Sequence, residues 1–162
     1  MMSDPTQKNP IIIKPVKDSE AARLALPNLS DEWVADGSFW NLQSCIDTMQ
    51  NHQYLSSSAA MGGTSSDTWT GWYLATYEGS DCELLFIFTC SASRGQGIGA
   101  ALLEDLIKRA RAVGDIESIF LEVRISNQPA IKLYERFGFM RQSIRPRYYS
   151  NGEDALVYRC NL

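Results

Sequence analysis

One glycine-rich stretch, Arg94-Gly95-Gln96-Gly97-Ile98-Gly99-Ala100-Ala101-Leu102-Leu103, has the residue types and spacing of a binding turn. It follows the apolar run Leu84–Phe88 and opens the amphipathic segment Ala100–Val113, which indicates a strand, a turn and a helix. Glycines at alternate positions leave backbone N–H groups accessible, and the helix start adds unpaired donors and about half a positive charge of dipole. The stretch therefore predicts an anion site, most simply for a phosphate.

Two common nucleotide-binding designs fit this turn poorly. An ATP-binding P-loop needs Lys-Ser or Lys-Thr after its last glycine, whereas Ala100-Ala101 stands there. The spacing Gly95-x-Gly97-x-x-Ala100 fits the dinucleotide fingerprint, and Glu122 lies near the distance expected of its ribose-binding acid. That fingerprint normally opens a domain, but 94 residues precede Gly95 and about one further strand–helix unit follows it. Phosphoryl transfer is therefore not expected, and the context argues against a nicotinamide cofactor.

The elements that must hold this turn are predicted from hydrophobic periodicity and from turn residues. The predicted strands are Ile11–Pro15, Tyr54–Ala60, Thr68–Glu78, Glu83–Thr89, Ser118–Val123, Phe139–Ile144 and Ala155–Arg159. The predicted helices are Asp18–Leu26, a short and a longer one within Ser30–Gln50 with the second capped by Asn41, Ala100–Val113 and Asn127–Phe137. The predicted connections include a loop at Met61–Asp67 and a turn at Gly79–Asp81. This order predicts an α/β (α+β) fold with a mixed, mostly antiparallel sheet of six to seven strands and helices on both faces.

Length and composition favour a single domain. At 162 residues we expect a mobile tail over residues 1–10 and a single domain over residues 11–162. No apolar run approaches the roughly 20 residues of a membrane span, and the N-terminus is polar, so we expect a cytoplasmic protein that does not bind membranes. The four cysteines form no C-x-x-C pair, and His52 is the single histidine. We therefore expect reduced thiols and no metal.

Charge is divided unevenly along the chain. The net charge of −4 argues against a general nucleic-acid binder. Between Arg23 and Arg94 there are eight acidic residues and no Lys or Arg, whereas from Arg94 onward eleven basic residues face eight acidic ones. Solvated loops and helix N-termini would explain this, since both favour Asp and Glu. The alternative is a basic half for an anionic cofactor and an acidic half for a cationic substrate.

The glycine turn resembles the pyrophosphate loop of the GNAT acetyltransferases, whose pattern Arg/Gln-x-x-Gly-x-Gly/Ala is carried here by Arg94, Gly97 and Gly99. Further family motifs follow in the right order and spacing. They are Leu121-Glu122-Val123-Arg124-x-Ser126-Asn127, Ala130-Ile131-x-Leu133-Tyr134-x-x-x-Gly138-Phe139, and Arg147-Tyr148-Tyr149 with Gly152-Glu153-Asp154-Ala155. The last motif narrows the resemblance to the RimI and archaeal Ard1 group, which acetylates protein N-termini. Before residue 83 the match is poor.

The resemblance implies acetyl-CoA as cosubstrate. The residues that it assigns to the cofactor are Ile87, Phe88, Thr89, Arg94, Gly95, Gln96, Gly97, Ile98, Gly99, Ala100 and Asn127. Strand residues among them would offer backbone groups to the pantetheine arm, and one N–H there could stabilise an oxyanion. Asn127 also precedes Pro129, which suits it to cap a helix.

Acetylation of an amine needs a base and benefits from an acid. An α-amine of pKa about 7.7 to 8.0 is roughly a tenth neutral at pH 7, against well under 1% for a lysine near 10.4, so a modest base suffices. Glu122 ends a predicted strand beside the glycine turn, where it could act directly or through water, and the resemblance implies that it is the proton acceptor. The departing CoA thiolate has a cysteine-like pKa of about 8.5, and Tyr134 is the candidate acid. The structural alternatives are an outward strand residue for Glu122 and a core tyrosine for Tyr134.

Two tyrosines complete the predicted site. Tyr148 and Tyr149 resemble the peptide-binding tyrosines in the family's loop over the acceptor. Cys90 lies beside the cofactor strand, but no histidine is paired with it in the sequence pattern, so direct transfer is expected rather than an acetyl-enzyme.

The sequence as a whole predicts a protein N-α-acetyltransferase. If the resemblance extends to the substrate, the acceptor is the N-terminal alanine of a small-subunit ribosomal protein. The expected partners are acetyl-CoA and a basic protein N-terminus, with no nucleic acid, and the expected state is a monomer or weak homodimer. One alternative is an acetyltransferase for a polyamine or an aminoglycoside, which the acidic block favours equally. Another is a non-catalytic acetyl-CoA-binding module, which should lose nothing when Glu122 becomes Gln.

Overall fold

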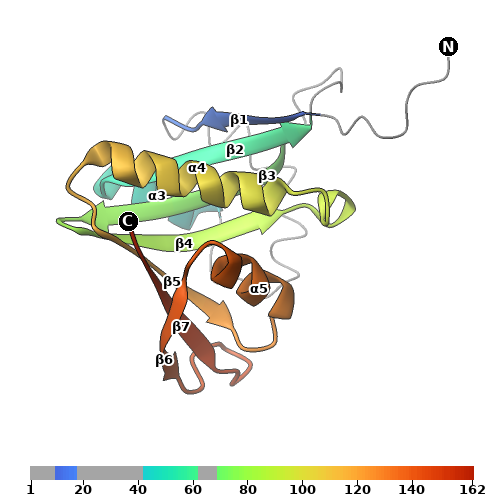
Figure 1. The fold of residues 1–162 in the computed structure, drawn as a ribbon, viewed down its shortest axis with the longest axis vertical. Coiled ribbons are helices and arrows are strands. Elements are labelled where there is room, and N and C mark those ends of the chain that lie inside the picture. The colour runs from blue at the N-terminus through green and yellow to red at the C-terminus, as the bar shows by residue number, and fades with distance from the viewer. Residues whose placement is uncertain (1–9, 18–41, 62–68) are drawn as a thin grey trace, which may run out of the picture.

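The computed structural model describes residues 10–17, 42–61 and 69–162, and Figure 1 shows its fold. The strands in this part of the chain are β1 (Ile11–Pro15), β2 (Tyr54–Met61), β3 (Trp69–Glu78), β4 (Asp81–Thr89), β5 (Ser118–Arg124), β6 (Met140–Arg145) and β7 (Ala155–Asn161). The helices there are α3 (Leu42–Asn51), α4 (Ile98–Val113), α5 (Gln128–Arg136) and the short 3-10 helix η1 (Ser91–Ser93). The predicted α/β class is confirmed.

All seven strands form one sheet in the order β1-β2-β3-β4-β5-β7-β6. Every neighbouring pair is antiparallel except β4 and β5, which run parallel. The mixed, mostly antiparallel sheet that we predicted is therefore confirmed. The position of β7 was not predicted. This strand lies between β5 and β6, so β6 is the edge strand on that side of the sheet.

Helices cover both faces of this sheet, as Figure 1 shows for α4 on one face and α3 on the other. The alternation of side chains along β3 explains the arrangement. Trp72 and Leu74 pack with Cys45 of α3 in one buried cluster, whereas Tyr73 and Ala75 belong to the larger cluster beneath α4. β3 is therefore apolar on both sides because each side meets a helix.

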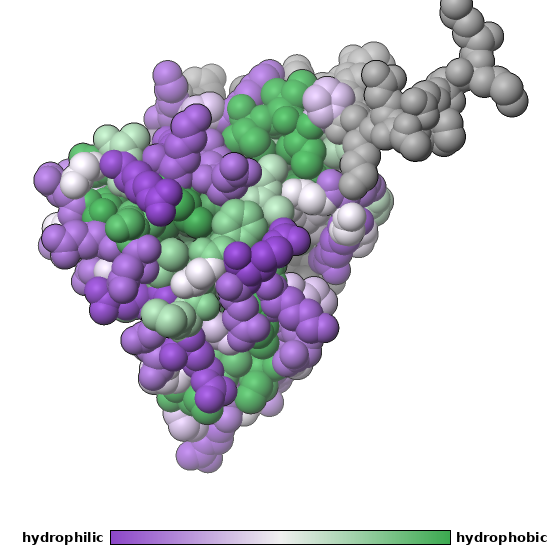
Figure 2. All heavy atoms as spheres, in the orientation of Figure 1, coloured by the Kyte–Doolittle hydropathy of each residue, from purple (hydrophilic) through white to green (hydrophobic). Residues whose placement is uncertain are grey.

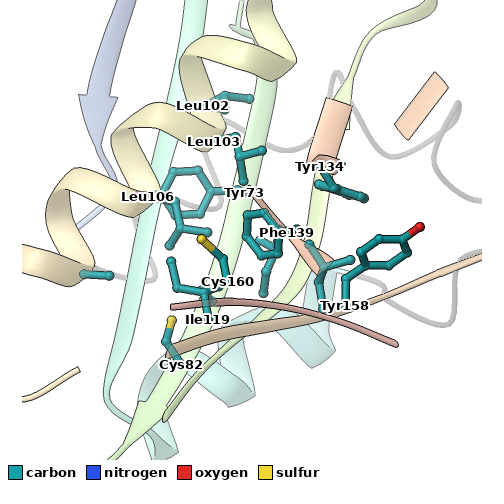
Figure 3. Close-up of a cluster of buried hydrophobic side chains, with 14 of the residues drawn as sticks. Tyr73, Cys82, Leu102, Leu103, Leu106, Ile119, Tyr134, Phe139, Tyr158 and Cys160 are labelled. Carbon is teal, nitrogen blue, oxygen red and sulfur yellow. The ribbon is translucent and has the colours of Figure 1, made fainter. Parts of the chain in front are cut away.

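The larger core lies under α4, and Figure 3 shows its side chains. Leu102, Leu103 and Leu106 descend from α4 at helical spacing and are fully buried. Each such side chain contributes about 1.5–3 kcal/mol relative to an exposed one. Tyr134 and Phe139 enter the same core from α5 and the residue before β6. The core therefore fixes α4 and α5, the two helices that follow β4 and β5, against one face of the sheet.

The start of α4 approaches the sheet closely because β3 has a glycine there. A Cβ on Gly71 would lie 2.7 Å from Ile98 Cγ2, 2.9 Å from the Phe88 carbonyl oxygen and 3.0 Å from Leu102 Cδ1. No side chain larger than hydrogen fits without moving the helix or β4. Gly71 thereby sets the position of the first turn of α4, and our reading of the sequence missed it.

Most predicted boundaries in this part of the chain are confirmed to within two residues, and the differences have local causes. α4 begins at Ile98 rather than Ala100, because left-handed Gly97 (φ 91°) already serves as its N-cap. β4 begins at Asp81 rather than Glu83, because Glu78 pairs directly with Asp81 across a two-residue turn. Met61, which we placed in a loop, is the last residue of β2.

Several predictions lie outside the described residues. They are the tail over residues 1–9, the helix Asp18–Leu26, the short helix and the Asn41 cap within Ser30–Gln50, and the loop over residues 62–67. The longer helix of that segment is confirmed as α3. All four cysteines are free thiols, as expected. Among the described residues there is no helix with the length and apolarity of a bilayer span, and no His/Cys/Asp/Glu group of three or more suited to a metal.

Candidate active site

Among the strands that the structure describes, β4 and β5 are the one parallel pair, and these two strands separate part-way along the sheet. The β4–β5 ladder runs from Asp81–Ser118 to Leu84–Leu121 and ends there. Beyond that point β4 continues along β3 as far as Thr89, and β5 continues along β7 as far as Arg124, so the two strands diverge, as Figure 1 shows. The carboxyl ends of neighbouring parallel strands are the usual ligand site of such sheets.

The glycine turn lies at the end of β4 and opens into α4. Gly95 and Gly97 have φ values of 75° and 91°, which side chains other than glycine adopt at a cost. The first intrahelical bond runs from the Ala101 N–H to the Gly97 carbonyl oxygen at 3.0 Å. The N–H groups of the three helical residues before Ala101 therefore point out of the helix start, where they can bind an anion.

Two side chains of this turn bind the turn itself. Arg94 donates from Nε to the Thr89 carbonyl oxygen at 3.2 Å, and Gln96 donates from Nε2 to the Ala92 carbonyl oxygen at 3.2 Å. A Cβ added at Gly95 would meet no heavy atom within 4 Å, and one added at Gly97 would contact Ile11 Cδ1 at 3.8 Å, so the Gly95 position lies open. Side-chain hydrogen bonds thus stabilise a turn whose backbone N–H groups can bind an anion such as a pyrophosphate.

Asn127 caps α5 at the carboxyl end of β5. Its Oδ1 accepts a 3.3 Å hydrogen bond from the Ala130 N–H, and Pro129 stands in the first turn, where a missing N–H costs nothing. The capping alternative to cofactor binding is thus realised in the structure. The cap uses the Oδ1 of Asn127 and does not engage its amide Nδ2.

Glu122 is the first residue of β5 beyond the β4–β5 ladder. It lies opposite Val157 of β7, and its side chain is 16% exposed. Its Oε1 lies 2.8 Å from Nη1 of Arg145. A hydrogen bond with the same carboxylate is the main cause that raises the pKa of Tyr148 to about 12. The structure therefore brings predicted base Glu122 and predicted acceptor residue Tyr148 into contact, and it adds Arg145, which the sequence did not single out.

Tyr134 lies on α5 with 5% of its surface exposed, and its ring packs 5.8 Å from that of Phe139. Burial is the main cause that raises the pKa of Tyr134, and the nearby Tyr149 adds to it. The hydroxyl is therefore protonated at neutral pH, as a proton donor must be. Tyr134 is also a core residue, so the alternative weighed for it is part of its role.

The loop between β6 and β7, which carries Tyr148 and Tyr149, is tied to the end of β5. The guanidinium carbon of Arg124 lies 3.8 Å from the centroid of the Tyr149 ring, and Arg124 Nη1 lies 3.2 Å from Glu153 Oε2. Hydrogen bonds from Ser126, including one of 2.8 Å from its N–H, lower the pKa of Glu153 to about 2. The Gly-Glu-Asp-Ala motif thus anchors the tyrosine loop beside Glu122.

A cleft of about 640 Å³ extends from Glu122 along the sheet. Cross-strand pairing places Glu83 opposite both Thr76 and Phe120, so their side chains share one face with Glu122. Glu78 and Asp81 also line the cleft, and His52 stands exposed at its rim. The acidic middle of the sequence and Glu122 therefore meet in one cleft. The opposite face of the sheet, which carries α4 and α5, is mostly hydrophilic at its surface, with smaller apolar patches between elements (Figure 2).

Comparison with known proteins settles the family. The model of the acetyltransferase (GNAT) family matches residues 31–139. The chain belongs to this family. The expected resemblance to GNAT acetyltransferases is thereby confirmed.

Individual relatives point to N-terminal acetyltransferases. An N-alpha-acetyltransferase of Sulfurisphaera tokodaii is 47% identical over 69 residues, which are 43% of this chain and 41% of that protein. N-alpha-acetyltransferase 30 of Homo sapiens is 46% identical over 66 residues, 41% of this chain and 18% of that protein. The matched region therefore spans well under half the length of these relatives.

Solved structures share the whole fold. The ribosomal-protein-S18-alanine N-acetyltransferase of Escherichia coli superposes with a TM-score of 0.75 at 25% identity, over 93% of each chain. Arabidopsis thaliana NAA60 in complex with acetyl-CoA gives a TM-score of 0.76 at 18% identity, over 94% of this chain and 99% of that one. The RimI-like resemblance is confirmed by the first of these.

Proposed function

We propose that this chain is an acetyl-CoA-dependent N-acetyltransferase that transfers an acetyl group directly to the α-amine of a protein N-terminus. The observation that carries the proposal is the position of Glu122, at the point where β4 and β5 separate, with the braced glycine turn at the end of β4. Similarity to proteins named N-alpha-acetyltransferases supports the choice of acceptor.

The residues present fit acetyl-CoA. The N–H groups at Gly95–Ala100 suit the pyrophosphate of acetyl-CoA, and Asn127 Nδ2 can donate to the cofactor. The Ile87–Thr89 segment of β4 does not pair with β5, so it offers backbone groups to the extended arm of the cofactor. Acetyl-CoA supplies the acetyl group as a thioester and releases CoA as a thiolate.

The protein's own groups move the protons. Glu122 accepts a proton from the acceptor ammonium, for which a carboxylate suffices because an α-amine has a pKa of only about 7.7 to 8.0. Tyr134, kept protonated by burial, donates to the departing thiolate. A backbone N–H of Ile87–Thr89 stabilises the oxygen charge that develops as the amine attacks.

The acceptor side favours a cationic chain. Glu78, Asp81 and Glu83 line the cleft that reaches Glu122, and Tyr148, on the anchored loop, hydrogen-bonds with Glu122. We propose a basic protein N-terminus as acceptor, and in particular the N-terminal alanine of a small-subunit ribosomal protein. This choice is supported by the similarity to the Escherichia coli enzyme that is named for that substrate.

The same acidic cleft favours one second candidate, a small polyamine or aminoglycoside acceptor. The test is CoA release from acetyl-CoA with an Ala-starting basic peptide, its N-terminally blocked copy and spermidine. The proposal predicts turnover on the free peptide alone. Turnover on spermidine alone would replace it with small-molecule acetylation. Silence on both, with tight acetyl-CoA binding, would favour a binding module.

A further inference from the structure

Arg145, on the edge strand β6, forms an ion pair with the carboxylate of Glu122. It is the last residue of β6 and pairs with Ala155 of β7. Its side chain is 57% exposed, whereas that of Glu122 is 16% exposed. The exposed guanidinium of Arg145 therefore pairs with a carboxylate that is mostly buried. The Cζ of Arg145 lies 5.5 Å from the centroid of the Tyr148 ring.

The two arginines near Glu122 are held very differently. Arg124 donates to Glu153 and Asn151 and stacks on Tyr149, so these three groups hold it in position. The Arg145 side chain forms an ion pair with Glu122 and a cation–π contact with the Tyr148 ring. The Arg145 end of this ion pair is exposed, so water and side-chain entropy compete with the pair at that end. Arg124 is thus fixed, whereas Arg145 can leave at little cost.

The acceptor arrives with the same charge. At neutral pH most of an α-amine is ammonium, which must come within hydrogen-bond reach of the base that deprotonates it. Oε1 of Glu122 is already occupied by a cation at 2.8 Å. The Tyr148 hydroxyl also hydrogen-bonds with this carboxylate, so an ammonium that takes the position of the guanidinium on Oε1 displaces Arg145.

We propose that Arg145 is a positioning residue that holds the place of the acceptor ammonium beside Glu122 and is displaced when the acceptor binds. This inference rests on the proposed function. One cation replaces another, so the sheltered carboxylate stays charge-compensated and aimed into the cleft throughout. A consequence is competition: Arg145 lowers the affinity of the enzyme for acceptors with a free amine, and for those alone.

The test measures acceptor binding and turnover in Arg145→Gln, with Arg145→Lys keeping the charge. Arg141→Gln is the matched control, since Arg141 lies on the same strand, pairs with Tyr158 and loses the same charge on the opposite face. Calorimetry with CoA present gives Kd for an Ala-starting basic peptide and for its N-acetylated copy. Steady-state CoA release gives KM and kcat for the free peptide, and KM for acetyl-CoA.

The proposal predicts that Arg145→Gln binds the free-amine peptide roughly two- to fivefold more tightly, as the modest strength of exposed ion pairs allows. The Kd of the acetylated copy, the KM for acetyl-CoA and the values of the Arg141→Gln control should not change. Arg145→Lys should stay within about twofold of wild type, because it keeps the charge that pairs with Glu122. An equal gain in affinity for the free and the acetylated peptide would mean that only the net charge of the surface matters. Weaker binding of the free peptide would mean that Arg145 contacts the acceptor. Either result would overturn the proposal that the acceptor displaces Arg145. If no variant binds the free peptide, the proposed function fails as well, whereas binding without turnover refutes only the chemistry.

Discussion

The substitution Gly71→Ala tests how the sheet positions the glycine turn at the start of α4. A Cβ at this position would lie 2.7 Å from Ile98 Cγ2 and 2.9 Å from the backbone oxygen of Phe88. The carbonyl is part of the β3–β4 ladder and cannot rotate away, so the start of α4 must move. Overpacking of this kind costs about 1–3 kcal/mol, and the lower entropy of the unfolded alanine chain returns about 0.4–1 kcal/mol. We expect a net loss of roughly 1–2 kcal/mol.

Urea unfolding followed by circular dichroism measures this loss, and the melting temperature should fall by roughly 2–8 °C, at about 2–4 °C per kcal/mol for a domain of this size. Gly99→Ala is the matched control for stability, because its Cβ would meet nothing closer than 3.4 Å and would lie within a helix. That variant should be as stable as wild type or more so. Equal midpoints for Gly71→Ala and wild type would refute the close approach of α4 to β3.

Two further predictions concern the acid and the anchored loop. Tyr134→Phe should lower kcat about 100-fold with little change in KM, because it removes the proton donor but keeps the buried ring; a kcat within twofold of wild type, in CoA-release assays, would leave Tyr134 as a core residue alone. The pKa of Glu153 in the folded protein, about 2, lies below its unfolded value near 4.5. Its contribution to stability is therefore complete above about pH 4.5 and is lost as the pH falls towards 2. Glu153→Gln should flatten the loss of stability over that window in denaturant titrations, and parallel curves for the two proteins would contradict the assignment.

The sequence predicted those parts of the structure that depend on local pattern. The run before Thr89 and the run Ser118–Val123 read as strands, and each is followed by a glycine or asparagine that starts a helix. Because both elements were placed, Glu122 was assigned to the strand that pairs with β4, near its carboxyl end. Local residue types encode such elements, since caps and periodicity act over a few residues.

The parts that sequence reasoning missed depend on pairing between distant segments. Gly71 matters only because α4 crosses β3 at that residue, and nothing around Gly71 indicates which helix does so. Arg145 reaches Glu122 only because β7 lies between β5 and β6, an order that no local pattern reveals. The signal available was the family motif Arg147-Tyr148-Tyr149, which marked the loop but not Arg145, two residues before the motif.

The most direct test of the proposed chemistry is CoA release from acetyl-CoA and an Ala-starting basic peptide by Glu122→Gln, beside wild type and the control Glu104→Gln on the exposed side of α4. If Glu122 is the base at the point where β4 and β5 separate, kcat/KM for the peptide falls by about 10²–10⁴, while acetyl-CoA binding and the melting temperature stay at wild-type values. A kcat/KM within about twofold of wild type would contradict that role.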